Sequence, residues 1–196
     1  MKILLGVTGG VAAKLIPKLA KMLVERGHEV QIVVTDKAQY FFEFNNSDFL
    51  GDAGIEVEPG TYVPVWRDKD EWGGTIYHKD QSIPHIALTQ WADVFALVPL
   101  TANTIGKIAN GICDNLLTSE VMAWPVDKPL VLAPAMNTVM WSNVIMQQNL
   151  LTIQLTWRTI VVPPVEKRLA CGDVGMGALA DLSDIVKTIS VATIYS

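Results

Sequence analysis

Residues 2–10, KILLGVTGG, join a run of apolar residues to a Thr-Gly-Gly turn. A short apolar run before a turn is typical of a buried strand, and the two glycines allow the chain to turn tightly. Residues 11–26 then have the apolar spacing of an amphipathic helix, which Gly27 closes. Pro17 removes a backbone donor inside this helix, so we expect a kink or a later helix start there. The stretch predicts a strand, a turn and a helix in succession.

The same alternation continues along the chain. A second buried strand at 30–34 completes a right-handed βαβ unit, whereas residues 45–82 are too irregular for one strand to cover them. This order predicts an α/β fold: a doubly wound, Rossmann-like or flavodoxin-like parallel sheet in three αβα layers, in a single domain spanning 1–196. Further strands are expected at 94–98, 130–133 and 159–162, and helices at 37–44, 82–92, 104–109, 115–124, 138–151 and 182–194, the last capped by Asp181.

The composition excludes several classes of protein. The 196 residues carry 15 Lys and Arg against 20 Asp and Glu, a net charge of −5 that argues against a nucleic-acid interface. Half of the residues are hydrophobic, yet no apolar run reaches the roughly 20 residues that cross a bilayer. We interpret the apolar surplus as a subunit interface. Cys113 and Cys171 have no metal-site spacing, so we expect no metal and a reducing, cytoplasmic location.

The candidate ligand site follows from the predicted sheet. Ligands of open parallel sheets bind beyond the carboxyl ends of the strands, where the strand order switches. Gly9 and Gly10 expose backbone N–H groups at a helix start, which suits a phosphate, and their spacing differs from the GxGxxG of dinucleotide sites. A mononucleotide is therefore favoured over NAD. Thr101, Asn103 and Thr104 offer further polar groups after a later strand, although simple helix capping would also explain them.

A second unusual segment is residues 167–178, KRLACGDVGMGA. Its three glycines give backbone freedom around Cys171, and the preceding Lys167 and Arg168 would favour the thiolate form of that residue. Taken alone, the segment is equally consistent with a turn that contains a cysteine by chance.

Four motifs together point to a known family. They are PLTANT at 99–104, DNLL at 114–117, PAMNTVMW at 134–141 and LACGD at 169–173. With them the chain resembles the homo-oligomeric flavin-containing cysteine decarboxylases, and among these the single-domain phosphopantothenoylcysteine decarboxylases of the halotolerance-protein type. The likeness extends over residues 2–189.

This resemblance implies FMN as cofactor and a homotrimer, or a higher oligomer of trimers, with active sites at subunit contacts. It implies decarboxylation of 4′-phosphopantothenoylcysteine to 4′-phosphopantetheine in coenzyme A biosynthesis, by thiol oxidation, loss of CO2 and reduction of the ene-thiol. Gly10 stands where the family commonly has a serine, so one hydroxyl contact to the FMN phosphate is absent. The implied cofactor-binding residues are Gly9, Gly10, Val11, Thr35, Phe41, Thr101, Ala102, Asn103, Thr104 and Ala135.

The resemblance also implies catalytic roles for His85 and Cys171. His85 would be the base or electrostatic partner of the oxidation, although a lone histidine near a helix start is more often a surface residue. Cys171 would protonate the reduced product and must then be a thiol, so the neighbouring cations would face the substrate phosphate instead. Residues 164–180 would form a flap over the substrate. The implied substrate-binding residues are Asn137, Met140, Lys167 and Arg168.

Three alternatives remain open from the sequence. Peptidyl-cysteine decarboxylases stop at the ene-thiol and lack the equivalent of Cys171. Flavin prenyltransferases share the architecture but are less similar in the PAMNTVMW and LACGD segments. A non-catalytic flavoprotein that regulates a phosphatase would not need His85, Asn137 and Cys171 together.

Overall fold

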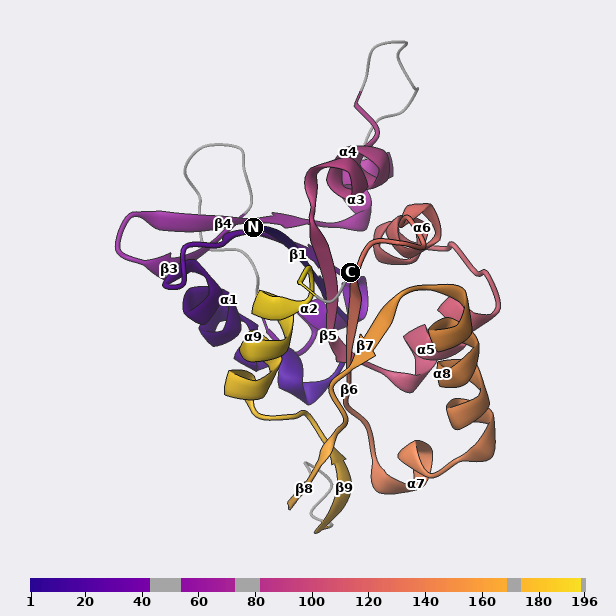
Figure 1. Ribbon diagram of the computed structural model, residues 1–196. Coiled ribbons are helices and arrows are strands. Elements are labelled where there is room, and N and C mark those ends of the chain that lie inside the picture. The colour runs from indigo at the N-terminus through magenta and orange to yellow at the C-terminus, as the bar shows by residue number, and fades with distance from the viewer. Residues whose placement is uncertain (43–53, 73–81, 169–173, 195–196) are drawn as a thin grey trace.

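The computed structural model describes residues 1–42, 54–72, 82–168 and 174–194 (Figure 1). Its centre is a seven-stranded sheet in the order β3-β4-β2-β1-β5-β6-β7. All neighbouring strands are parallel except β3 and β4, which pair antiparallel at one edge. A separate antiparallel hairpin is formed by β8 and β9. The strands are β1 (Lys2–Val7), β2 (Glu29–Val34), β3 (Gly54–Glu58), β4 (Thr61–Trp66), β5 (Val94–Leu100), β6 (Leu130–Pro134), β7 (Thr159–Val161), β8 (Val165–Arg168) and β9 (Val174–Ala178).

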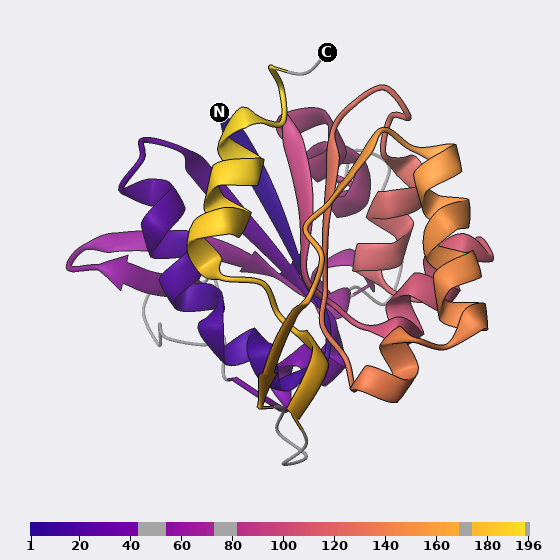
Figure 2. The same cartoon turned by 60° about the horizontal axis from the view of Figure 1, so that its bottom comes forward.

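Helices cover both faces of the sheet (Figure 2). Side chains of α1 and α9 form one apolar cluster with the sheet, and those of α4, α5, α6 and α8 form a second cluster on the other face. This arrangement confirms the predicted doubly wound α/β fold in three layers. The helices are the 3₁₀ helix η1 (Val11–Leu15), α1 (Ile16–Val24), α2 (Asp36–Gln39), α3 (Asp68–Trp72), α4 (Pro84–Trp91), α5 (Ala102–Ala109), α6 (Leu116–Ala123), α7 (Thr138–Trp141), α8 (Val144–Thr156) and α9 (Leu182–Val191).

The first strand shows why the apolar run was informative. Ile3 and Leu5 belong to the cluster beneath α1 and α9, whereas Leu4 belongs to the opposite one, and all three are fully buried. Because successive side chains of a strand point to opposite faces, a strand covered on both faces must be apolar at nearly every position.

Proline and asparagine decide two helix boundaries. Pro17 lies in the first turn of α1, where backbone N–H groups have no partner within the helix, so its missing N–H costs no hydrogen bond. The preceding residues form η1 instead. The expectation of a later helix start is confirmed. The expectation of one helix over 138–151 is wrong, because Asn143 has an extended backbone and its side chain accepts a hydrogen bond from the N–H of Ile145 at 2.9 Å. That cap starts α8 as a separate helix.

Two further segments differ from the sequence prediction. The short helix expected at 37–44 is α2, which ends at Gln39, and residues 43 and 44 lie outside the described residues. Residues 54–66, part of the stretch that is too irregular for one strand to cover, form the hairpin of β3 and β4. None of the helices in the described ranges has the length and apolar character needed to span a membrane.

Two glycines offer a matched test of the packing. A Cβ atom on Gly6 in β1 would lie 2.5 Å from Leu97 Cδ2 and 3.0 Å from Phe95 Cε2, whereas one on Gly106 in α5 would lie 3.7 Å from its nearest neighbour. We expect Gly6→Ala to reduce the free energy of unfolding by about 1–3 kcal/mol through overpacking. Gly106→Ala should raise it by about 0.5–1 kcal/mol through helix propensity. Urea unfolding of both variants measures these changes, and equal stabilities would contradict the packing described for β1.

Candidate functional site

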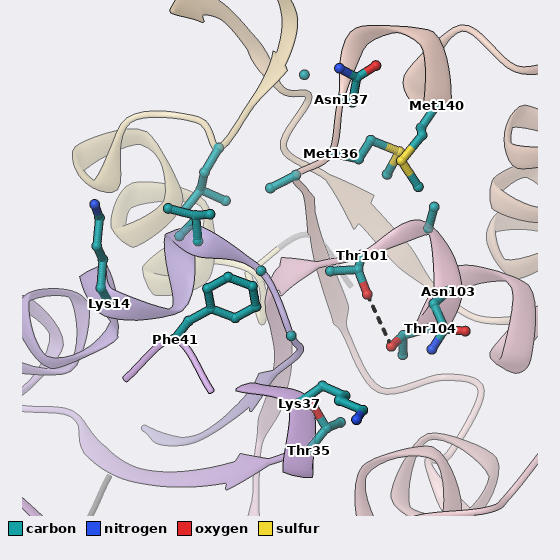
Figure 3. Close-up of a pocket in the computed structure, with 18 of the residues that line it drawn as sticks. Lys14, Thr35, Lys37, Phe41, Thr101, Asn103, Thr104, Met136, Asn137 and Met140 are labelled. Atoms are coloured by element: carbon teal, nitrogen blue, oxygen red, sulfur yellow. Dashed lines mark hydrogen bonds between the residues drawn. The ribbon is translucent and has the colours of Figure 1, made fainter. Parts of the chain in front are cut away.

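A cleft of about 1010 Å³ opens at the carboxyl ends of β1, β2, β5 and β6. The strand order switches at β1, because β2 lies on one side of it and β5 on the other. Figure 3 shows Phe41 and Lys14 on one side of this cleft and Thr101, Asn103 and Thr104 on the opposite side. All ten residues expected to bind the cofactor line the cleft: Gly9, Gly10, Val11, Thr35, Phe41, Thr101, Ala102, Asn103, Thr104 and Ala135.

A buried threonine joins the two loops at the centre of the cleft. The hydroxyl of Thr8 donates to the carbonyl of Pro99 at 2.7 Å and accepts from the N–H of Thr101 at 2.9 Å. Thr8 is fully buried, so these bonds are shielded from water. Sequence reasoning did not assign this role to Thr8; the available signal was a hydroxyl between an apolar strand and two glycines.

The first turn of α5 directs backbone donors at the cleft. Thr101 has an extended backbone at the N-cap position, and Ile105 is the first residue whose N–H bonds back, to the Thr101 carbonyl at 3.0 Å. Among the described residues, the Thr101 side chain makes no capping bond, and its hydroxyl lies 3.4 Å from that of Thr104. Simple capping therefore does not account for this hydroxyl. A helix start with uncapped N–H groups suits an anion.

Two residues predicted to bind the substrate lie in and just after the loop before α7. The Asn137 side-chain oxygen accepts from the N–H of Val139 at 2.8 Å, which fixes the amide at the edge of the cleft that Met140 also lines (Figure 3). The β8–β9 hairpin lies against this loop, since the N–H of Met136 donates to the Gly177 carbonyl at 2.9 Å. Gly177 has a φ of +147°, and a Cβ there would collide with the carbonyl of Met136.

Two further residues of the hairpin, Gly175 and Lys167, contact neighbouring segments. A Cβ atom on Gly175 would collide with the side chain of Thr138. Lys167 lines the cleft, and its Nζ lies 2.5 Å from Asp181 Oδ1. The prediction that the Asp181 side chain caps α9 is therefore wrong, because that carboxylate pairs with Lys167 and makes no capping bond among the described residues. Cys171 lies outside the described residues, as does the side chain of Arg168.

His85 does not line the cleft within the described part of one chain. It lies in the first turn of α4, with its side chain 26% exposed, and its Nδ1 is 2.5 Å from Oε1 of Glu71 on α3. Sequence reasoning did not identify Glu71, because the contact joins two short helices that no motif connects.

Glu120 on α6 is a buried acid that the sequence analysis also missed. It is fully buried, and neither carboxylate oxygen has a hydrogen-bond partner among the described residues. Burial raises the pKa of Glu120 well above the ordinary 4.5, and the negative charge of Glu71 raises it further. Both effects favour the neutral carboxylic acid.

A model of the flavoprotein family matches residues 1–193. The chain belongs to the flavoprotein family. Phosphopantothenoylcysteine decarboxylase of Mus musculus is 39% identical over 96% of this flavoprotein and 85% of the mouse protein. A Schizosaccharomyces pombe protein named probable thymidylate synthase is 42% identical over 96% of this chain, which spans only 28% of that protein's length.

Solved structures agree with this assignment. A PPC decarboxylase mutant complexed with pantothenoylaminoethenethiol superposes on this flavoprotein with a TM-score of 0.82 and 38% identity, over 97% of this chain and 96% of that one. The FMN binding protein AtHal3 superposes with a TM-score of 0.80 and 38% identity, over 100% of this chain and 97% of that one. The resemblance read from the sequence motifs is confirmed.

The buried acid gives this flavoprotein a testable pH dependence. Because folding raises the pKa of Glu120, the folded chain holds a proton that the unfolded chain releases above 4.5, and stability falls as the pH rises through that window. Glu120→Gln removes the carboxyl group and with it this dependence of stability on pH. We expect the variant to gain stability relative to wild type as the pH rises, by at most about 1.4 kcal/mol per pH unit. Urea unfolding from about pH 5 to about pH 8 measures the difference; parallel stability curves would exclude a perturbed Glu120.

Proposed function

We propose that this flavoprotein uses FMN to decarboxylate 4′-phosphopantothenoylcysteine to 4′-phosphopantetheine in coenzyme A biosynthesis. One observation carries the proposal: Asn137 and Met140 line the same cleft as the glycine turn and the start of α5, in a chain 39% identical to a protein named phosphopantothenoylcysteine decarboxylase. The similar solved structure that holds pantothenoylaminoethenethiol supports the substrate class.

The cleft fits FMN in two ways: it offers backbone N–H donors, and its glycine turn has no side chains to block the approach of a phosphate. The first-turn N–H groups of α5 and the backbone at Gly9 and Gly10 suit the phosphate, and Gly9 approaches α2 so closely that a Cβ would lie 2.5 Å from Lys37 Cβ. The ten cleft residues named above would hold the cofactor. When bound, FMN supplies the two-electron oxidation of the substrate thiol and returns the electrons after CO2 has left.

The protein's own residues then bind the substrate and move protons. Asn137 holds the substrate carboxylate or its amide, and Met140 positions that group. His85 acts as base or electrostatic partner in the oxidation, and Cys171 gives the final proton, for which it must be a thiol. Residues 164–180 cover the substrate.

The substrate phosphate is assigned to the cations of the hairpin. Lys167 and Arg168 face it, and Lys167 exchanges Asp181 for the phosphate when substrate binds.

A homotrimer, or a higher oligomer of trimers, completes the site in this proposal. As far as the described residues show, His85 lies outside the cleft of its own chain, and we assign it to the cleft of a neighbouring copy. Exposed apolar side chains support such an assembly, since Val139, Val144, Ile145 and Leu155 are each more than 60% exposed. Helix α8 carries apolar side chains at exposed positions such as Ile145 and Leu155 as well as at buried ones, which is typical of a surface that a partner covers. The assembly works in the cytoplasm.

Gly9 and Gly10 provide a matched test of the proposal that the glycine turn binds FMN. Gly9→Ala places a Cβ against Lys37, so the turn must move and FMN affinity should fall by about tenfold or more, about 1.4 kcal/mol. A Cβ on Gly10 would lie 3.5 Å from Thr101 Cγ2, an ordinary contact, so Gly10→Ser should bind FMN at least as tightly as wild type. Quenching of FMN fluorescence measures both affinities. Equal losses of FMN affinity in the two variants would argue against a specific role of the close contact between Gly9 and Lys37.

The reaction is tested by identifying its product. Flavin-loaded protein should release CO2 from 4′-phosphopantothenoylcysteine and form 4′-phosphopantetheine, as measured by mass spectrometry. Cys171→Ser should still release CO2 but accumulate an oxidised product derived from the ene-thiol. His85→Asn should prevent bleaching of the flavin under anaerobic conditions. Absence of CO2 from wild type would refute the proposed function, and normal phosphopantetheine yield from Cys171→Ser would remove that residue from the mechanism.

A further inference from the structure

Glu71 holds residue 85 at two points. Its Oε2 accepts from the backbone N–H of His85 at 3.0 Å, and its Oε1 lies 2.5 Å from the ring Nδ1. Pro84 begins α4 and has no N–H, so the N–H of His85 is the first that needs a partner, and Ile83 at the N-cap position has no polar side chain to supply one. Helix capping explains the first contact. It does not explain the second.

The two contacts together determine where the imidazole proton lies. A carboxylate can only accept hydrogen bonds, and both oxygens of Glu71 face nitrogen atoms of residue 85. Nδ1 of His85 therefore carries its hydrogen toward Glu71, and Nε2 of the neutral ring is left with a lone pair. The Glu71 side chain is only 6% exposed, so water competes little for these contacts.

Glu120 adds no second negative charge beside Glu71 and His85. It lies on α6, which packs against α4, and its burial favours its neutral form, as does its electrostatic interaction with Glu71. The negative charge beside His85 is thus carried by Glu71 rather than shared between two carboxylates.

We propose that Glu71 is a positioning residue that fixes His85 as the Nδ1–H tautomer and thereby presents Nε2 as the proton acceptor of the reaction. This inference rests on the proposed role of His85 in thiol oxidation. In the proton transfer, the substrate S–H bond breaks, its electron pair stays on sulfur, and a new N–H bond forms at Nε2. Glu71 then faces the imidazolium that results and stabilises its charge.

The test is a pair of isosteric substitutions read by nitrogen NMR. In Glu71→Gln, the amide oxygen can keep the bond to the backbone N–H of His85 while the NH2 group faces Nδ1, which must then accept. With ¹⁵N-labelled histidine, wild type should show a protonated Nδ1 and an unprotonated Nε2 for neutral His85, and Glu71→Gln should show the reverse. Glu120→Gln should keep the wild-type tautomer, and Glu71→Asp should restore it in part. The spectrum of His85→Asn assigns the signals among the three histidines.

Kinetics complete the test. Flavin bleaching in Glu71→Gln should slow by about 10²-fold or more, with substrate affinity little changed, because a general base typically contributes about 10²–10⁴-fold. An Nε2–H tautomer in wild type would overturn the proposal whether or not the protein decarboxylates its substrate. Bleaching at the wild-type rate in a Glu71→Gln protein with the reversed tautomer would overturn it as well. If wild type shows the expected tautomer but does not bleach, the proposed function fails while the Glu71–His85 arrangement stands.

Discussion

The hydroxyl of Thr8 links the ends of β1 and β5, the two strands at the point where the strand order of the sheet switches. Its bonds to the Pro99 carbonyl and the Thr101 N–H hold the ends of β1 and β5 together in the dry interior. Because the glycine turn follows Thr8 and α5 follows Thr101, these two bonds also set the separation between the two groups of backbone donors that line the cleft. The relative placement of these donors therefore depends on a buried side chain that does not itself line the cleft.

The central strands could be predicted because burial on both faces leaves an apolar run that few other structures explain. The edge hairpin could not. Strand β4 is only half-buried and contains Pro64, which normally argues against a strand, and its parallel pairing with β2 joins residues distant in the sequence. The break between α7 and α8 is hidden for a different reason: the apolar pattern continues through Asn143, whereas a single hydrogen bond to the Asn143 side chain starts a new helix there.

The cleft residues could be predicted for the same reason as the strands, since the carboxyl ends of parallel strands share one edge of the sheet. The surroundings of His85 could not be predicted. Glu71 and Glu120 come from α3 and α6, and only the packing of these helices around α4 brings the three titratable groups into one neighbourhood. No periodicity or motif encodes such a contact, and the family motifs concern the cleft rather than the support behind the histidine.

Gly175 and Gly177 have a consequence for substrate selection. Both face the loop of Met136 and Thr138 at distances that exclude even a methyl group, so at these two positions the hairpin meets that loop through main-chain atoms. In the proposed function, selection at this edge of the cleft then rests on side chains beside the contact, and Lys167 is a described residue whose charge suits a substrate phosphate.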